Sequence, residues 1–177
     1  MTNRRSHIVL MGFMGSGKST VGSLLARNMD RLFIDMDQLI VEKEKMSISN
    51  IFEEKGETYF RKIESEVLQT VLNSELSSII STGGGTPCFF GGINYINKNS
   101  FSFYLKVGRG AIFKRIQGDI KRPLINNKTN SELKQFIDES IRERVAFYKQ
   151  ANQTILAYGQ PDKIVKRILY YLDKENI

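Results

Sequence analysis

The chain has 177 residues, of which 41% are hydrophobic and 25% charged, which predicts one globular domain spanning residues 1–177. It holds no apolar stretch as long as a membrane span, no secretory signal in its polar first residues and a single cysteine, so we expect a cytoplasmic protein with no membrane partner. Its net charge of +7 comes from dispersed basic residues that form no nucleic-acid motif, so we expect no nucleic-acid partner.

The first expected strand, His7–Met11, leads into the most informative motif of the chain, Gly12-Phe13-Met14-Gly15-Ser16-Gly17-Lys18-Ser19. This is the spacing of a P-loop, in which glycines let backbone N–H groups and the next helix's N-terminus point at phosphate oxygens. Lys18 adds a mobile positive charge, and Ser19 offers a hydroxyl suited to Mg²⁺. The motif predicts a nucleotide site, and a Gly-rich turn without nucleotide is the less favoured interpretation.

The second expected strand, Arg31–Asp35, ends in Asp35-Met36-Asp37. Residues two apart on an extended strand point the same way, so we expect Asp35 and Asp37 to line one crevice. If this strand lies beside the P-loop region, one carboxylate would support Mg²⁺, directly or through water, while the other meets an acceptor hydroxyl. The alternative is a solvated pair that begins a helix, with Asp37 as its N-cap.

Helical spacing follows the aspartate pair. The expected helices run over about Gln38–Lys45, over Ile48–Lys55, which Gly56 ends, and through Tyr59–Val71. In the last of them, Phe60-Arg61-Lys62-Ile63-Glu64 places Arg61 and Glu64 three residues apart on one helical face. Such a pair fixes a guanidinium as a carboxylate receptor, although many pairs at this spacing are only solvated surface residues.

The third expected strand, Ser78–Ser81, leads into Thr82-Gly83-Gly84-Gly85, where bare backbone can approach a ligand closely. The fourth expected strand, Phe101–Val107, precedes a helix around Ala111–Ile116 that Gly118 ends. The triple glycine is therefore a second candidate for a ligand-binding loop.

Residues Asp119–Asn130 are polar and broken, which predicts a mobile surface loop that closes over the site as a lid. Within it, Arg122-Pro123-Leu124 would deliver Arg122 to the transferring phosphoryl group. Arg144, on a helix expected over Ser131–Tyr148, is a further candidate cation. The alternative for each arginine is a solvated surface position. The chain is expected to end with a strand at Gln153–Ala157 and a helix at about Asp162–Leu172.

Strands that alternate with helices predict an α/β fold, with a parallel sheet covered on both faces. In such sheets ligands bind beyond the carboxyl ends of the strands. The P-loop, the aspartate pair and the triple glycine each follow an expected strand, so each lies in the kind of place where such a ligand site is expected.

Taken together, these motifs resemble the shikimate kinase family, in the family's order and approximate spacing over nearly the whole chain. The resemblance implies transfer of the ATP γ-phosphoryl group to the 3-hydroxyl of shikimate, on the route to chorismate and the aromatic amino acids. It also implies a monomer with a three-layer α/β/α P-loop kinase fold, whose five parallel strands have the order 2-3-1-4-5, as in nucleoside monophosphate kinases. The lid would lie at about residues 119–130, and a substrate-binding helical region at about 37–73.

The resemblance also implies the roles of individual residues. Catalysis would fall to Asp37, Lys18 and Arg122. The ATP-binding residues would be Gly12, Gly15, Ser16, Gly17, Lys18, Ser19, Thr20, Arg115, Arg122 and Pro161. The shikimate-binding residues would be Asp37, Phe52, Phe60, Arg61, Gly83, Gly84, Gly85 and Arg144. Because the third strand lacks the usual terminal aspartate, the Mg²⁺ cofactor would depend on Ser19 and Asp35.

Two other functions are compatible with parts of the sequence. Another small-acceptor P-loop kinase, such as a gluconate kinase, would share the P-loop, but the triple glycine and Phe60-Arg61 disfavour it. A nucleotide-binding or RNA-binding P-loop module without catalysis is suggested by the net charge of +7.

Overall fold

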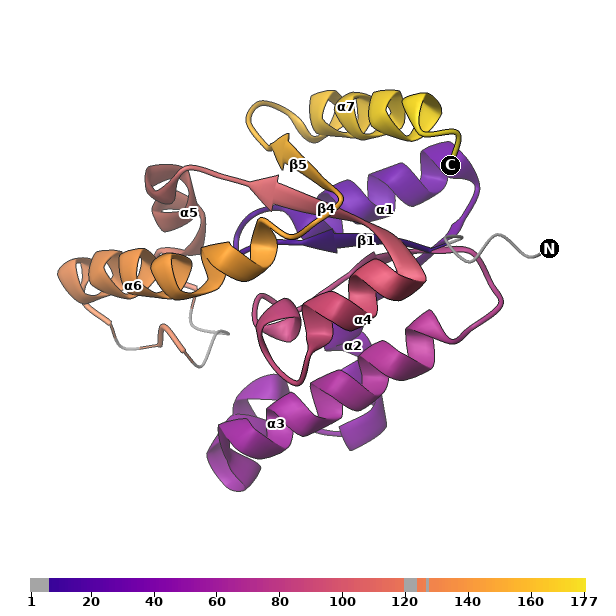
Figure 1. Ribbon diagram of the computed structural model, residues 1–177. Helices are drawn as coiled ribbons and strands as arrows, with labels where there is room; N and C mark the ends of the chain where they lie inside the picture. Colours follow the sequence, from indigo (N-terminus) through magenta and orange to yellow (C-terminus); the bar gives the residue numbers. More distant parts are fainter. Residues whose placement is uncertain (1–6, 120–123, 127) are drawn as a thin grey trace.

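The structure is a computed structural model that describes residues 7–119, 124–126 and 128–177. Five parallel strands form one sheet in the order β2-β3-β1-β4-β5 (Figure 1). The strands are β1 (His7–Met11), β2 (Leu32–Asp35), β3 (Ser78–Ser81), β4 (Ser100–Lys106) and β5 (Gln153–Leu156). The predicted fold class and strand order are therefore confirmed, and each expected strand lies within one residue of an observed one.

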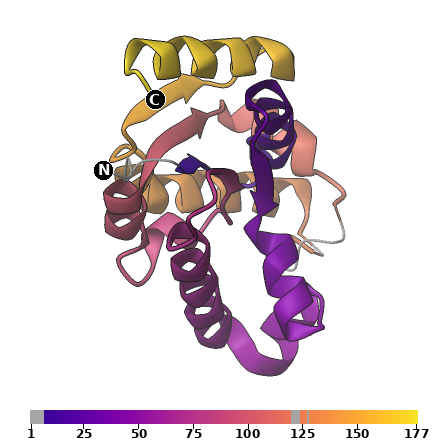
Figure 2. The ribbon, with the colours of Figure 1, turned by 90° about the vertical axis from the view of Figure 1, so that its right-hand side faces the viewer.

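Helices cover both faces of this sheet. They are α1 (Lys18–Met29), α2 (Met36–Glu44), α3 (Ile48–Leu72), α4 (Gly92–Asn99), α5 (Arg109–Ile116), α6 (Asn130–Tyr148) and α7 (Pro161–Lys174), with a short 3₁₀ helix, η1 (Thr86–Cys88). In two perpendicular views, α2 and α3 lie at the end of the molecule opposite α7 (Figures 1 and 2).

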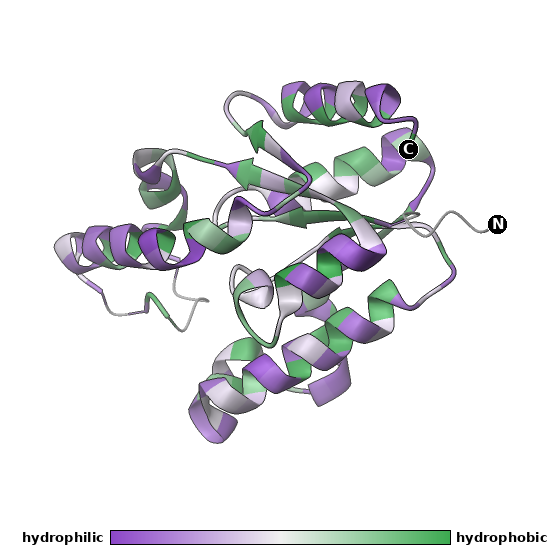
Figure 3. Ribbon diagram, in the orientation of Figure 1, coloured by the Kyte–Doolittle hydropathy of each residue, from purple (hydrophilic) through white to green (hydrophobic). Residues whose placement is uncertain are grey.

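The central strand β1 divides the core into two layers. Ile8 and Leu10 pack with side chains of α1 and α7, whereas Val9 and Met11 pack with the helices of the other face. All four side chains are fully buried, as expected for a parallel strand covered on both sides. Hydrophobic residues accordingly concentrate in the strands (Figure 3).

The helix prediction was incomplete between β3 and β4, where it did not assign η1 and α4. The α4 helix has only eight residues and begins at two glycines, Gly91 and Gly92, which are weak helix formers. Gly92 serves packing instead, because a side chain there would overlap the carbonyl of Thr86. Tertiary contact thus decides this helix more than its own sequence does.

The expected helix stop at Gly56 is a kink within α3. Gly56 has φ 79° and ψ 169°, and the helix resumes beyond it to Leu72. This backbone region is essentially restricted to glycine. The kink separates the short first limb of α3 from the limb that carries Arg61.

Only part of the expected lid belongs to the described residues, and Arg122 and Pro123 lie outside them. Where the segment is described, it is not wholly a polar surface loop. Ile125 is 6% exposed and packs into the core, because an apolar side chain there gains more from burial than from exposure. In the described part of the chain, no helix combines the length and apolar character needed to span a bilayer.

We predict opposite stability effects for alanine at two glycines. Gly56→Ala should destabilise the fold by about 1–3 kcal/mol, because alanine is strained at this φ and ψ. Gly110→Ala, in α5 with open space around its Cα, should stabilise it by up to about 1 kcal/mol, because alanine restricts the unfolded chain. Urea unfolding of both variants measures the change in the free energy of unfolding. Changes of the same sign in the two variants would contradict the prediction that the kink requires glycine at position 56.

Candidate active site

The P-loop connects the buried end of β1 to the first turn of α1. Gly15 has φ 73°, and a side chain there would overlap that of Ile116, so only glycine fits. Gly17, with φ 92°, precedes the helix and offers no side-chain cap. The unsatisfied N–H groups and the positive end of the α1 dipole therefore face the loop, as an anion site requires.

Two buried polar groups of the P-loop favour a phosphate. The Ser16 hydroxyl is buried and has no hydrogen-bond partner within the described ranges, which is an unfavourable state unless a ligand supplies one. Lys18 is 8% exposed, and its Nζ donates to the carbonyls of Gly12 at 2.9 Å and Phe13 at 3.1 Å. A positive charge buried this deeply beside the loop favours the binding of an anion there.

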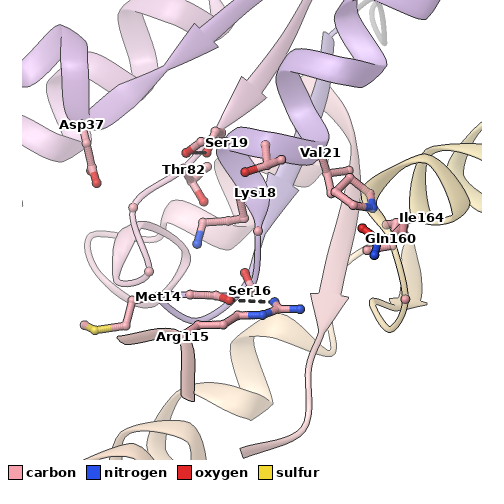
Figure 4. A pocket seen from close by; sticks show the side chains of 18 residues that line it. Met14, Ser16, Lys18, Ser19, Val21, Asp37, Thr82, Arg115, Gln160 and Ile164 are labelled. Carbon is pink, nitrogen blue, oxygen red and sulfur yellow. Dashed lines mark hydrogen bonds between the residues drawn. The ribbon is translucent and has the colours of Figure 1, made fainter. Parts of the chain in front are cut away.

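A cavity of about 510 Å³ opens over this loop (Figure 4). Most of the residues predicted to bind ATP line it, namely Gly15, Ser16, Gly17, Lys18, Ser19, Thr20, Arg115 and Pro161. Gly12 does not line it, and contributes through its carbonyl to Lys18. Arg115 donates from Nη1 to the Gly15 carbonyl at 2.9 Å, so this guanidinium is anchored at the cavity edge.

The cavity is also lined by residues that were not among those predicted to bind ATP. Thr82 follows β3, while Gln160 and Ile164 belong to the start of α7 and lie opposite Asp37 (Figure 4). Of the residues at the start of α7, only Pro161 was predicted from the sequence to belong to the ATP site. The contact between α1 and the distant α7 is tertiary, and no motif marks it.

The aspartate pair does not lie on one strand as predicted. Asp35 ends β2 and is itself the N-cap of α2, because its Oδ1 accepts from the Asp37 N–H at 3.0 Å. Asp37 lies in the first turn of that helix, so the alternative with Asp37 as N-cap is also wrong. The strand ends two residues before Asp37, so the two aspartates cannot share one strand face. Asp37 nevertheless reaches the cavity, by way of the helix.

Ser19 and Asp35 come together as the metal prediction requires. Ser19 Oγ donates to Asp35 Oδ2 at 2.6 Å, and Ser81 Oγ lies 3.4 Å from Ser19 Oγ. A hydroxyl beside a carboxylate suits Mg²⁺, which prefers hard oxygen ligands and keeps several waters. Across the described ranges there is no cluster of three His, Cys, Asp or Glu side chains, so a metal here would need oxygens from phosphate and water.

A second cavity, of about 330 Å³, adjoins the first. All eight residues predicted to bind the acceptor line it, namely Asp37, Phe52, Phe60, Arg61, Gly83, Gly84, Gly85 and Arg144. Asp37, Met14, Gly83 and Gly84 line both cavities. Asp37 therefore lies at the common border, where an acceptor hydroxyl in one cavity would meet a phosphate in the other.

Arg61 is held in a buried ion-pair network and is not a solvated surface residue. It is 5% exposed, and its Nη1 donates to Glu64 Oε2 at 2.9 Å, while Nη2 and Nε donate to Glu57 Oε1 at 2.9 and 3.2 Å. Burial opposes the charged guanidinium, but Glu64 and Glu57 outweigh it and raise the pKa of Arg61 above its usual value. Arg61 is therefore a fixed positive charge.

The triple glycine packs directly against this network. A side chain at Gly83 would overlap the Glu64 carboxylate, and one at Gly85 would overlap the Arg61 guanidinium. Glu64 also accepts from Thr86 Oγ1 at 2.7 Å, so it ties α3 to the segment after the glycines. Glycine is required here for close approach to charged side chains as well as for access to a ligand.

Helix α6 supplies the other side of the second cavity. Tyr148 is fully buried, stacks on Tyr104 and donates from its hydroxyl to the Gly84 carbonyl at 2.5 Å. Burial raises the pKa of Tyr148 well above its usual value, so it remains a donor. Arg144, one turn earlier, forms no ion pair with any carboxylate of the described chain. It is therefore available to an anionic ligand.

The apolar wall of this cavity is larger than predicted. Phe52 and Phe60 contact each other with ring centroids 4.6 Å apart, as expected for a wall behind a flat ring. Met14, Ile48 and Leu124 extend it. Ile48 could have been found, because it lies four residues before Phe52 on the same helical face.

Comparisons with known proteins agree with this geometry. A family model described as shikimate kinase matches residues 14–173. A shikimate kinase of Sulfurihydrogenibium is 40% identical over 164 residues, which cover 92% of this chain and 95% of that protein.

Solved structures point to the same family. The shikimate kinase of Bacteroides thetaiotaomicron superposes with a TM-score of 0.88 at 33% identity, covering 94% of this chain and 98% of that one. The Acinetobacter baumannii shikimate kinase, solved in complex with shikimate, has a TM-score of 0.90 at 28% identity, covering 97% of this chain and 94% of that one. With a family model that matches most of its length and relatives at 40% identity, this chain belongs to the shikimate kinase family.

Proposed function

We propose that this protein transfers the γ-phosphoryl group of ATP to the 3-hydroxyl of shikimate, forming shikimate 3-phosphate and ADP. The observation that carries the proposal is the pair of adjoining cavities with Asp37 on their common border. One cavity has the anion-binding features of a nucleotide site, and the other combines two guanidiniums with an aromatic wall. That second combination suits a small ring bearing a carboxylate and hydroxyls.

In this mechanism Asp37 orients the attacking hydroxyl and accepts its proton. The acceptor oxygen forms a bond to the γ-phosphorus while the bond to the β,γ-bridging oxygen breaks, and charge spreads over the phosphoryl oxygens. Lys18 and the P-loop N–H groups stabilise that charge. Ser19 and Asp35 would hold Mg²⁺ with the phosphates, and the ion when bound supplies further charge neutralisation.

The acceptor carboxylate would be bound by Arg144 and Arg61, with backbone N–H groups of Gly83–Gly85 beside them. Because Glu57 and Glu64 already occupy three of the N–H donors of Arg61, Arg144 is the stronger partner for an added carboxylate. Phe52 and Phe60 would cover the face of the ring. The carboxylate thereby sets which hydroxyl reaches Asp37.

Other parts of the proposal rest on the sequence and the family resemblance. Arg122 is proposed as a lid arginine that stabilises the transferring phosphoryl group. We also propose that the protein acts as a single domain and a cytoplasmic monomer without nucleic-acid or membrane partners, which its composition and dispersed basic residues support.

A coupled assay of ADP release tests the proposed activity. With Mg²⁺ and ATP, turnover should depend on shikimate and should stop when EDTA removes the metal ion. Gluconate and other polyol acids should give no turnover above background. Turnover with gluconate but not shikimate would refute the proposal, as would salt-sensitive RNA binding without phosphoryl transfer.

We predict that Asp37→Asn lowers kcat by a factor on the order of 10² or more, because the amide cannot accept the hydroxyl proton. Binding of ATP, measured by calorimetry, should remain near that of the natural protein. Glu42→Gln, an exposed position on the same helix α2, is the matched control and should leave kcat unchanged. Near-normal turnover of Asp37→Asn would exclude the role of general base.

Arg144→Ala should raise the KM for shikimate by roughly 10- to 100-fold, because a charge-assisted contact to the carboxylate is lost. The variant leaves no buried carboxylate unpaired, since Arg144 forms no ion pair within the described chain. The KM for ATP should stay constant. Arg142→Ala, exposed on the same helix, is the control, and equal effects of the two variants would show that Arg144 has no special role.

A further inference from the structure

Three aromatic rings surround the guanidinium of Arg61. Its Cζ lies 4.6 Å from the ring centroid of Phe89, 5.2 Å from that of Phe60 and 5.9 Å from that of Phe52. Phe52 and Phe60 belong to α3, as Arg61 does, and line the acceptor cavity. Phe89 comes from the segment after η1, does not line that cavity and is the nearest ring of the three.

The two carboxylates that bind Arg61 do not by themselves fix its guanidinium, so the Phe89 ring can add to its positioning. Glu64 and Glu57 bind the N–H groups of the guanidinium, whereas the Phe89 ring lies against the cation, with its centroid 4.6 Å from Cζ. The Glu57 side chain is 51% exposed, so water screens its hold on Arg61. A ring packed against the guanidinium restricts motions that the exposed carboxylate does not.

Phe89 is also far more exposed than the cation that it contacts. Arg61 is 5% exposed and Phe89 is 38% exposed, so the cation is almost fully removed from water while the residue against it still meets water. A cation–π contact is stronger at a desolvated cation than at a hydrated one. Loss of the ring would therefore admit water to Arg61 and weaken its interaction with an incoming carboxylate.

The backbone holds Phe89 in this place. Its carbonyl accepts from the Gly92 N–H at 2.9 Å, and the Cys88 N–H donates to the Gly85 carbonyl at 2.8 Å, which links the turn to the triple glycine. Phe90, which follows Phe89 in this turn, has φ 49°, a left-handed conformation that is unusual for a bulky residue. Such an outlier persists where the surrounding structure requires it.

We propose that Phe89 is a positioning residue for the substrate carboxylate, whose ring holds the Arg61 guanidinium in the orientation that meets the acceptor. The inference rests on the proposed function for its kinetic consequence, because it takes Arg61 as part of the carboxylate receptor. Phe89 has no contact with the reacting atoms in this scheme. Its loss should therefore affect binding of the acceptor and not the phosphoryl transfer step.

The test compares Phe89→Leu, which keeps apolar bulk but removes the aromatic face, with Phe89→Tyr, which keeps it. Phe89→Leu should raise the KM for shikimate by about 3- to 30-fold, with kcat and the KM for ATP within about twofold of the natural protein. Phe89→Tyr should restore the KM. Phe90→Leu is the matched control, since Phe90 is the neighbouring exposed phenylalanine, and it should change none of these values.

A spectroscopic measurement tests the contact without catalysis. The Arg61 Nε–H resonance should be displaced by the ring current of Phe89, should move in Phe89→Leu and should stay in Phe90→Leu, with Arg61→Lys used for assignment. An unchanged resonance in Phe89→Leu would overturn the proposal, as would an unchanged KM for shikimate or equal effects of Phe89→Leu and Phe90→Leu. If the natural protein fails to phosphorylate shikimate, the proposed function is wrong, while the resonance still decides whether Phe89 holds Arg61.

Discussion

The acceptor side of this molecule depends on the buried ion pair between Arg61 and Glu64. Removing one partner of such a pair typically destabilises a protein by about 3–5 kcal/mol, whereas the intact pair contributes little net stability. Its importance here is positional. Glu64 connects α3 to Thr86, and Gly83 and Gly85 fit only because their missing side chains leave room for the two charged groups. The pair thereby sets the distance between the kinked helix and the glycine loop.

The order of the strands in the sheet is the second constraint on the position of the site. With β3 between β2 and β1, the carboxyl ends of three adjacent strands place Asp35, the triple glycine and the P-loop at one edge of the sheet. The nucleotide and acceptor cavities therefore share a border in place of lying on separate faces. The two arginines of the acceptor cavity differ in their partners. Carboxylates bind part of the Arg61 guanidinium, whereas Arg144 forms no ion pair in the described chain. Of the two guanidiniums that line the acceptor cavity, that of Arg144 is therefore the one we propose for a ligand carboxylate.

Much of this site could be predicted from local sequence patterns. The P-loop motif and the strands on either side of it follow from short-range chemistry, namely glycine conformations and continuous apolar runs. The aspartate pair shows where such reasoning fails. Its two-residue spacing indicated one strand face, but the helix begins at Met36 because Asp35 caps it, so Asp37 reaches the cavity from a helix. A competing cap interaction outweighed the strand periodicity.

By itself the sequence determined the α/β class, the nucleotide loop and the family resemblance, because these depend on residue types at fixed spacing along the chain. Only the tertiary structure decided that Glu64 accepts a hydrogen bond from Thr86, that Tyr148 holds the Gly84 carbonyl and that Phe89 lies against the guanidinium. Gly84 and Tyr148 are 64 positions apart, and no local periodicity encodes contacts of that range. They arise when buried polar and charged groups from distant segments must satisfy one another as the sheet and its helices close around them.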